Sequence, residues 1–456
     1  MSRRKRSGNR PEFEIEITST TYPGIGVAFK DGQELHARRA FPGQIILARH
    51  LKNKQGIGQL QVLDQVKKAS WEVEPPCVHY EKCGGCMRQE VPYEMQLRYK
   101  EEEVLELFRD SGLEFNKYHG ILGSPSQWHY RNKMEYTFGD EYKEGPMCLG
   151  MHVKNRRNSI LTTDHCEIVP DDFNLLLKRT LDHFRGSGLD YYWPMGRRGT
   201  LRNLVLREGR RTGQLMAILV TTSDERVDAR AWAEDLLTVE TASQLTSIYH
   251  MTNDSFQDAV VPEKLELLHG QQFITEEICG LTFQITPTSF FQTSTEAAEK
   301  LFEQIVKLAG DVSEMDVFDL YCGTGTIGNI LAKSAYSVTG VEIIEEAALI
   351  AQENARINGN QNAVFIAGDV RDVLRDLEKT PDLIVMDPPR AGIHPKALEY
   401  AMAFNAKEMI YVSCNPKSLA NDLMKLQDTM SLEELILLDN YPNTNHVEAI
   451  VLMSRK

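Results

Sequence analysis

The sequence has no long hydrophobic run and no overall excess of basic charge. No apolar stretch in its 456 residues approaches the roughly 18 to 20 residues that span a bilayer, so we expect no membrane segment. The basic start, residues 1–6, has no apolar segment behind it, which argues against export and favours a cytoplasmic protein. The net charge of −14 argues against a protein that coats nucleic acid indiscriminately.

Cysteine is sparse, and its spacing is more informative than its number. In a reducing cytosol the eight cysteines are not expected to form disulfides, so a cluster of them indicates metal binding or catalysis. Cys77, Cys83 and Cys86 form such a cluster, with two glycines whose backbone amides can face thiolate sulfurs. The spacing alone leaves an iron-sulfur cluster and a zinc ion open. The nearby candidates for a fourth ligand are Cys148, Cys166, His79 and His165.

The length predicts two to four domains. Residues 1–11 are polar and basic and are expected to be a disordered tail. Short alternating strands between residues 12 and 70 predict a small β-barrel of OB type, a fold that often binds single-stranded nucleic acid. Residues 71–280 form a mixed central region, and residues 281–456 a final α/β domain. Residues 1–70 carry about twice as many basic as acidic side chains, which indicates a localised phosphate-binding surface.

The central region contains one clear helix and two basic segments. Tyr93 to Asp110 has the pattern of an amphipathic helix, to which we assign only a packing role. Trp128 to Lys133 mixes aromatic and basic residues, as a base-stacking surface or an ordinary strand would. Arginines between Gly196 and Arg211 predict a second basic patch, with a hairpin turn at residues 209–213.

The last domain alternates strands with helices, which is the pattern of a doubly wound α/β sheet. The strands are predicted at residues 317–320, 337–341, 363–366, 383–386 and 409–412.

A glycine-rich loop follows the first of these strands. Residues 319–328 include Gly323, where the backbone can approach a nucleotide-like ligand closely. Glu342 ends the next strand, 19 residues further on, where a carboxylate can accept the ribose hydroxyls. The loop has no Gly-Lys-Ser/Thr sequence and no basic residue for a pyrophosphate, which favours S-adenosylmethionine. Asp369 ends the third strand and is expected beside the adenine.

The last two predicted strands each end in reactive groups. The first is followed by Asp387-Pro388-Pro389-Arg390, and the second by Ser413-Cys414-Asn415-Pro416. Because the site of an open parallel sheet forms at the carboxyl ends of its strands, a thiol and a carboxylate are expected to meet at one ligand. This arrangement indicates that Cys414 attacks a nucleic-acid base.

These motifs give the chain a specific resemblance to a known family. It resembles the RNA uracil-5 methyltransferases over nearly its whole length. The motifs that carry the resemblance occur in the family's order: Phe290-Phe291-Gln292, Asp319-Leu320-Tyr321-Cys322-Gly323-x-Gly325, Asp387-Pro388-Pro389-Arg390, Ser413-Cys414-Asn415-Pro416 and His446-Val447-Glu448. The resemblance implies a Rossmann-like class I methyltransferase domain, a small β-barrel similar to a TRAM domain before it, and a central α+β domain that holds a [4Fe-4S] cluster.

The resemblance also implies roles for individual residues. Cys414 corresponds to the nucleophile and Glu448 to the base. Thr326 stands where members of the family often have asparagine, so its contact is the least certain to carry over. The implied contacts of S-adenosylmethionine are Gln292, Tyr321, Gly323, Thr326, Glu342, Asp369 and Asp387. The implied ligands of the [4Fe-4S] cluster are Cys77, Cys83, Cys86 and Cys166.

The chemistry requires such residues. Carbon 5 of uracil is too poor a nucleophile to take a methyl group from a sulfonium unaided. The Cys414 thiolate, added to carbon 6, turns the ring into an enolate, and a base such as Glu448 then removes the proton from carbon 5. The target base must be flipped out or already unpaired.

Four alternatives remain at this point. Asp387-Pro388-Pro389 also occurs in amino-group methyltransferases, although Arg390 stands where their aromatic residue belongs. Cytosine-5 methyltransferases also use a cysteine, in a different sequence setting. A non-catalytic iron-sulfur RNA-binding or assembly protein is a different class. The fourth alternative is the same chemistry on transfer RNA. Family members with a TRAM-like domain and a cluster act mostly on 23S ribosomal RNA, which favours that partner. We also expect a monomer.

Overall fold

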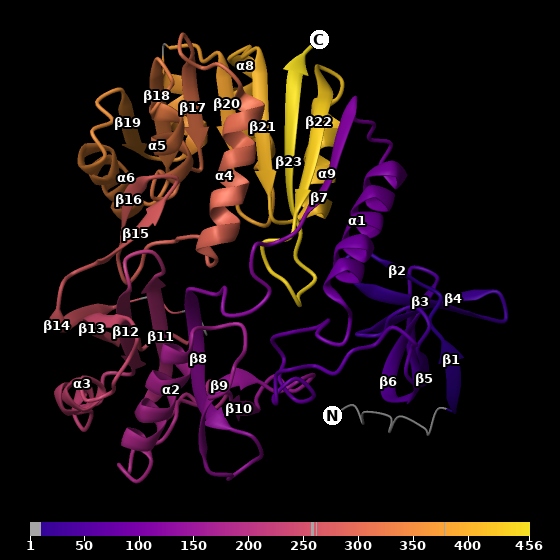
Figure 1. Ribbon diagram of the computed structural model, residues 1–456, viewed down its shortest axis with the longest axis vertical. Coiled ribbons are helices and arrows are strands. Elements are labelled where there is room, and N and C mark those ends of the chain that lie inside the picture. The colour runs from indigo at the N-terminus through magenta and orange to yellow at the C-terminus, as the bar shows by residue number, and fades with distance from the viewer. Residues whose placement is uncertain (1–10, 257–259, 261, 378) are drawn as a thin grey trace, which may run out of the picture.

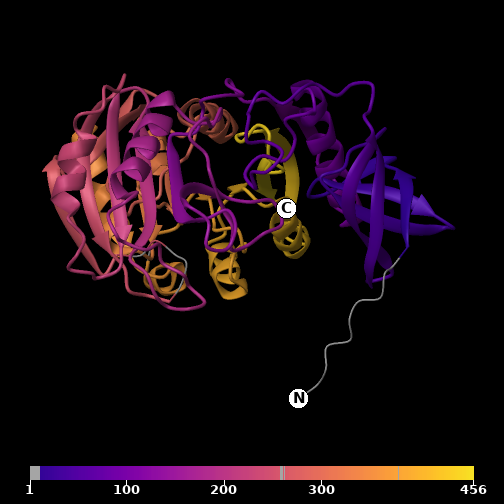
Figure 2. The ribbon, with the colours of Figure 1, turned by 90° about the horizontal axis from the view of Figure 1, so that it is seen from below.

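The computed structural model describes residues 11–256, 260, 262–377 and 379–456, so the predicted basic tail lies almost wholly outside the described residues. The described chain forms three lobes (Figures 1 and 2). In Figure 1 the N-terminal lobe lies at the lower right, the central lobe at the lower left and the C-terminal lobe at the top. No helix within the described ranges is long and apolar enough to cross a membrane.

The N-terminal lobe is built on a six-stranded sheet with the order β1-β5-β6-β4-β3-β2. Alternating side chains of these strands point inward, so that Ala28, Leu35 and Ile46 form part of its core. All neighbouring strands are antiparallel except β4 and β6. The strands are β1 (Glu12–Glu16), β2 (Ser19–Thr21), β3 (Ile25–Lys30), β4 (Gln33–Arg38), β5 (Ile45–Lys54) and β6 (Ile57–Lys67).

The central lobe is a seven-stranded sheet, β10-β9-β8-β11-β12-β13-β14, with two helices packed on it. Its predicted hairpin turn is confirmed, because Gly209 pairs with Gln214 across β11 and β12. The predicted basic patch is wrong for two arginines: Arg202 and Arg207 are buried and donate to backbone carbonyls. The elements are β8 (Lys133–Asp140), β9 (Met147–His152), β10 (Ile160–Thr162), β11 (Leu201–Gly209), β12 (Gln214–Thr221), β13 (Gln244–Thr252), β14 (Lys264–Gly270), α2 (Asp171–Phe184) and α3 (Ala229–Leu236).

The C-terminal lobe is an eight-stranded, doubly wound α/β sheet with the order β19-β18-β17-β20-β21-β23-β22-β7. The five predicted strands are confirmed, and they run parallel to one another. Strand β23 inserts antiparallel between β21 and β22, and β7 adds a further edge strand from far earlier in the sequence. The strands are β7 (Lys117–Leu122), β17 (Asp316–Leu320), β18 (Ser337–Glu342), β19 (Ala363–Ala367), β20 (Leu383–Met386), β21 (Glu408–Ser413), β22 (Met430–Leu438) and β23 (Glu448–Arg455).

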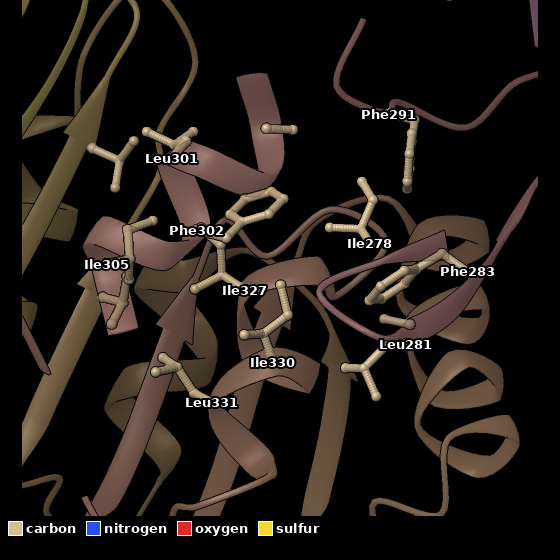
Figure 3. Close-up of a cluster of buried hydrophobic side chains, with 14 of the residues drawn as sticks. Ile278, Leu281, Phe283, Phe291, Leu301, Phe302, Ile305, Ile327, Ile330 and Leu331 are labelled. Atoms are coloured by element: carbon tan, nitrogen blue, oxygen red, sulfur yellow. The ribbon is translucent and has the colours of Figure 1, made fainter. Parts of the chain in front are cut away.

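Helices cover both faces of this sheet, which explains why its strands are continuously hydrophobic. Val385 points to one face and Ile384 to the other, and both are fully buried. Figure 3 shows part of the first core, where Phe283 and Phe302 pack near Ile330. The first face is covered by α4 (Thr295–Ala309), α5 (Thr326–Ala332), α6 (Glu345–Ile357) and the hairpin of β15 (Ile274–Ile278) and β16 (Leu281–Ile285). The second is covered by α1 (Tyr93–Asp110), α7 (Val370–Asp376), α8 (Pro395–Ala403) and α9 (Pro416–Leu426).

Candidate active site

The carboxyl ends of the parallel strands meet at one edge of the C-terminal sheet, which we call the catalytic edge. β17, β18, β20 and β21 are parallel neighbours, so the residues that follow them gather there. Tyr321, Glu342, Asp387 and Cys414 all lie at this edge. The thiol and the carboxylate that end two predicted strands are therefore brought to the same place, as expected.

Cys414 and Glu448 lie opposite each other across two antiparallel strands. Ser413, the last residue of β21, pairs with Ala449 of β23, so the next positions outward are Cys414 and Glu448. Glu448 is only 5 % exposed, whereas Cys414 is half-buried. The Asn415 side chain accepts the Lys417 amide at 3.3 Å and caps α9, which fixes the turn that presents the thiol.

Burial places both carboxyl groups of the site in the neutral pH range. It raises the pKa of Glu448 to about 8, with a further increase from Asp387 and an opposing effect of Arg390. It also raises the pKa of Asp387 to about 7. Burial, then Glu448 and Asp387, raise the pKa of the Cys414 thiol to about 11, against the pull of Arg390. The thiol therefore keeps its proton in the free protein, next to two carboxyl groups that can accept it.

Two hydrogen bonds that the sequence did not reveal hold Arg390 beside the thiol. Its guanidinium donates to His446 Nδ1 at 2.8 Å, and Asn415 Nδ2 donates to its carbonyl at 2.8 Å. Burial and the nearby cations, Arg390 first among them, lower the pKa of His446 to about 4. The imidazole is therefore neutral and can accept the hydrogen bond from Arg390.

The glycine-rich loop is organised by carboxylates and leaves open space. The Glu342 carboxylate accepts the Gly323 amide at 3.0 Å and the Ile344 amide at 2.9 Å. The buried Asp319 carboxyl accepts the Gly328 amide at 2.7 Å. Gly323 has a φ of 54°, and no atom lies within 4 Å of the position where its Cβ would stand. The loop is thus shaped for a ligand that approaches its backbone.

The remaining expected cofactor residues are distributed around the same edge. Thr326 begins α5 directly after the loop. Asp369 caps α7 through the Arg371 amide at 2.9 Å and pairs with the Arg371 side chain, which holds the pKa of Asp369 at about 2. Gln292 accepts the Tyr441 hydroxyl at 3.4 Å, in the loop that leads to Glu448.

Helix α1 supports that loop, residues 439–447, through buried polar groups. Lys100 Nζ contacts Asp439 Oδ1 at 2.7 Å, and neither side chain is exposed to solvent. Gln96 accepts the Asn443 amide at 2.9 Å. The expectation that α1 only packs is wrong. Polar residues recurring at helical spacing on its inner face, at positions 96, 100 and 103, were the signal that sequence reasoning missed.

In addition to the open space in front of Gly323, a second cavity lies between the central lobe and the 439–447 loop. Its volume is about 170 Å³, and its walls include Cys77, Cys83, Cys86 and Cys166. Thr444 and His446 of the loop also line it. The Gly85 amide donates to Cys83 Sγ at 3.4 Å, as the glycine pair in the sequence predicted. Cys148, the other cysteine considered, is buried elsewhere and is not among the lining residues.

Comparisons with known proteins find a matching family model, similar sequences and a similar solved structure. A sequence model of the tRNA (uracil-5-)-methyltransferase family matches residues 263–456. An RNA methyltransferase of Clostridium acetobutylicum is 44% identical, over 99% of this chain and 99% of its own length. One from Halalkalibacterium halodurans is 32% identical over 100% of both chains. The crystal structure of Pyrococcus abyssi tRNA (uracil-54, C5)-methyltransferase with S-adenosyl-L-homocysteine is similar, with a TM-score of 0.75, 25% identity, and 96% of this chain and 100% of that chain covered.

Proposed function

This chain belongs to the RNA uracil-5 methyltransferase family, and from that premise we propose that its target is a specific uridine of 23S ribosomal RNA. The reaction is transfer of a methyl group from S-adenosylmethionine to carbon 5 of uridine, which gives 5-methyluridine. The observation that supports the mechanism is the opposition of the Cys414 thiol and the Glu448 carboxyl at the catalytic edge.

The covalent step begins with Cys414. As its sulfur bonds to carbon 6, the thiol proton passes to the ionised Asp387 carboxylate, which leaves Glu448 ionised for the later removal of the carbon 5 proton. The electron pair of the carbon 5–carbon 6 bond moves toward oxygen 4, which gives an enolate. Arg390, the cation of this group, stabilises the negative charge that develops there.

The second half of the reaction restores the ring. Carbon 5 bonds to the methyl group that S-adenosylmethionine would supply. The methyl–sulfur bond breaks as the new bond forms, and S-adenosylhomocysteine is the leaving group. Carbon 5 then carries both the methyl group and its original proton, and Glu448 in its ionised form removes that proton. The electron pair re-forms the carbon 5–carbon 6 double bond, and the carbon–sulfur bond breaks to release Cys414 as thiolate.

The residues at the edge fit the nucleoside of S-adenosylmethionine. The space in front of Gly323 is open, and Glu342 is held at the loop where a ribose would bind. We assign the adenine side to Asp369. We also assign contacts with the cofactor to Gln292, Tyr321, Thr326 and Asp387.

The choice of ribosomal RNA rests on the accessory parts of the chain. We propose that residues 12–70 are a TRAM-like RNA-binding barrel, residues 71–280 an iron-sulfur domain and residues 281–456 the methyltransferase domain. Within the middle range, α1, β7 and β15 nevertheless pack with the C-terminal sheet. The family resemblance implies that members with both accessory parts act mostly on 23S ribosomal RNA. Transfer RNA is the second candidate, because the similar Pyrococcus abyssi enzyme acts on uracil 54 of transfer RNA.

A direct assay tests this proposal. Purified protein is incubated with methyl-labelled S-adenosylmethionine and either unmodified 23S ribosomal RNA or unmodified transfer RNA, and the nucleosides are analysed. We expect labelled 5-methyluridine in the ribosomal RNA alone. Label in transfer RNA alone would overturn the proposed substrate while keeping the chemistry, and label in another nucleoside would overturn the chemistry.

We propose that the four cysteines that line the second cavity hold a [4Fe-4S] cluster. A tetrahedral zinc site holds its sulfurs at about 2.3 Å from one ion. In the described part of the chain, the sulfurs of these four cysteines do not all lie within 4.8 Å of one another. Sulfurs spread around a larger cavity suit a cluster better than one ion. Methyl transfer moves no electron, so we expect the cluster to stabilise the fold.

Cys166→Ser is therefore expected to lose the bound iron, whereas Cys148→Ser keeps it. Both cysteines lie in the central region, but only Cys166 lines the cavity. The measurement is iron and acid-labile sulfide after anaerobic purification, and the wild type should carry about four of each per chain. Zinc without sulfide in the wild type would show that the assignment is wrong.

A further inference from the structure

The turn between β2 and β3 of the N-terminal lobe, residues 22–24, reaches the catalytic edge of the C-terminal lobe. The Tyr22 hydroxyl donates a hydrogen bond to Asn415 Oδ1 at 3.3 Å, across 393 residues of sequence. The ring packs against the hydrophobic core beneath that edge. Asn415 directly follows Cys414. A side chain of the first lobe therefore stands at the turn that carries the nucleophile.

Groups from helix α1 and from the 439–447 loop hold this turn in place. The Gly24 amide donates to Glu103 Oε2 at 2.7 Å, and Asn445 Nδ2 donates to the Pro23 carbonyl at 2.9 Å. Glu103 is paired with Arg88 at 3.1 Å, and both side chains are almost wholly buried. One side of the turn is bonded to Glu103, which is itself held by Arg88, and the other side is bonded to Asn445. The fold of the chain therefore fixes the position of Tyr22.

The Tyr22 side chain shares the electrostatic environment of the reacting groups. Arg390, Cys414, Glu103 and Glu448 all act on its hydroxyl. Burial is the largest effect and raises the pKa of Tyr22 to about 12, so the phenol is neutral and donates a hydrogen bond. The side chain is only half-buried. Tyr22 is thus partly open to solvent, and its hydroxyl is near enough to Cys414 for the two groups to influence each other.

Resting on the proposed function, we propose that Tyr22 forms one wall of the pocket that receives the target uracil and contacts the base while Cys414 attacks carbon 6. A base taken out of its stack is commonly held against an aromatic side chain. Tyr22 is the aromatic residue that the structure places on Asn415, beside the nucleophile. The N-terminal lobe then completes the catalytic site in addition to any contact it makes with RNA.

Full-length Tyr22→Ala and Tyr22→Phe test this inference. We measure turnover at saturating RNA, the affinity for RNA, and the rate of adduct formation with RNA containing 5-fluorouridine, whose fluorine cannot leave as a proton. Loss of base stacking in Tyr22→Ala should lower turnover and adduct formation at least about tenfold, with RNA affinity within about threefold of wild type. Tyr22→Phe keeps the ring and should retain at least about a third of wild-type turnover.

A matched pair of glycine variants tests the position of the turn. Gly24 has a φ of 68°, and a Cβ there would lie 2.4 Å from Arg88 Nη2 and 2.5 Å from Asn445 Cγ. Gly32, in the next turn of the same lobe, has a φ of 77°, and no atom lies within 4 Å of the position where its Cβ would stand. Gly24→Ala should reduce adduct formation as Tyr22→Ala does, and Gly32→Ala should not.

The outcomes separate this inference from the proposed function. Wild-type protein that forms neither an adduct nor 5-methyluridine contradicts the proposed function itself. An active wild type together with a fully active Tyr22→Ala overturns only the role of Tyr22. A Tyr22→Ala variant that loses RNA affinity but not turnover overturns it too, and so does a Tyr22→Phe variant as slow as Tyr22→Ala.

Discussion

Cys414→Ala should abolish RNA methylation and leave RNA binding almost unchanged. Without a sulfur at this position carbon 5 is never activated, so we expect turnover to fall by at least about 10⁴-fold, the scale on which loss of a covalent nucleophile acts in other enzymes. Affinity for RNA depends on contacts with the backbone rather than on the thiol, and should stay within about threefold of wild type. The measurements are label incorporation and filter binding with the same RNA.

Cys279→Ala provides the matched control. Cys279 is also a half-buried cysteine of the C-terminal lobe, but it lies in the β15–β16 turn, away from the catalytic edge. Its removal should leave methylation at the wild-type rate. Methylation by Cys414→Ala at the wild-type rate would contradict the covalent mechanism. It would also reopen the amino-group methyltransferase interpretation, in which the substrate nitrogen attacks the methyl group and no cysteine nucleophile is needed.

The sequence predicted the half of the site that local pattern determines. Buried parallel strands are continuous hydrophobic runs, so their ends, and with them Asp387 and Cys414, could be found without a structure. The glycine-rich loop and Glu342 follow from spacing in the same way. The cysteines of the second cavity could be proposed because three of them are close in sequence.

The other half depends on partners that are distant in the sequence. No pattern in β23 states that it inserts beside β21, yet only that pairing sets Glu448 against Cys414. The burial of Lys100 could not be foreseen, because lysine is usually exposed and its partner Asp439 lies 339 residues away. Arg207 was misjudged for the same reason, since its buried acceptors belong to residues 286 and 289. Charge alone could not distinguish basic residues on the surface from basic residues that are buried and hydrogen-bonded inside the fold.

Glu448→Gln should trap the enzyme on its RNA. An amide cannot take the carbon 5 proton, so the covalent product cannot be released. We expect turnover to fall by about 10²- to 10⁴-fold, while a protein–RNA adduct that carries one labelled methyl group accumulates. Denaturing gel electrophoresis measures this adduct. Glu408→Gln, at the opposite end of β21, is the control and should turn over normally.

The pKa of Glu448 adds a second readout, with a definite sign. The folded protein holds this proton up to about pH 8, whereas the unfolded chain loses it near the ordinary value of 4.5. The buried neutral carboxyl therefore contributes stability that is fully present below pH 4.5 and is lost as the pH rises toward 8. The amide that Glu448→Gln introduces cannot ionise, so the Tm of this variant relative to wild type should rise from pH 5 to pH 8. Wild-type turnover should increase over the upper part of this range, as the base becomes ionised. A Tm difference that does not change with pH, together with normal product release by Glu448→Gln, would assign the base to another group, for which Asp387, the other carboxyl that acts on Cys414, is the candidate.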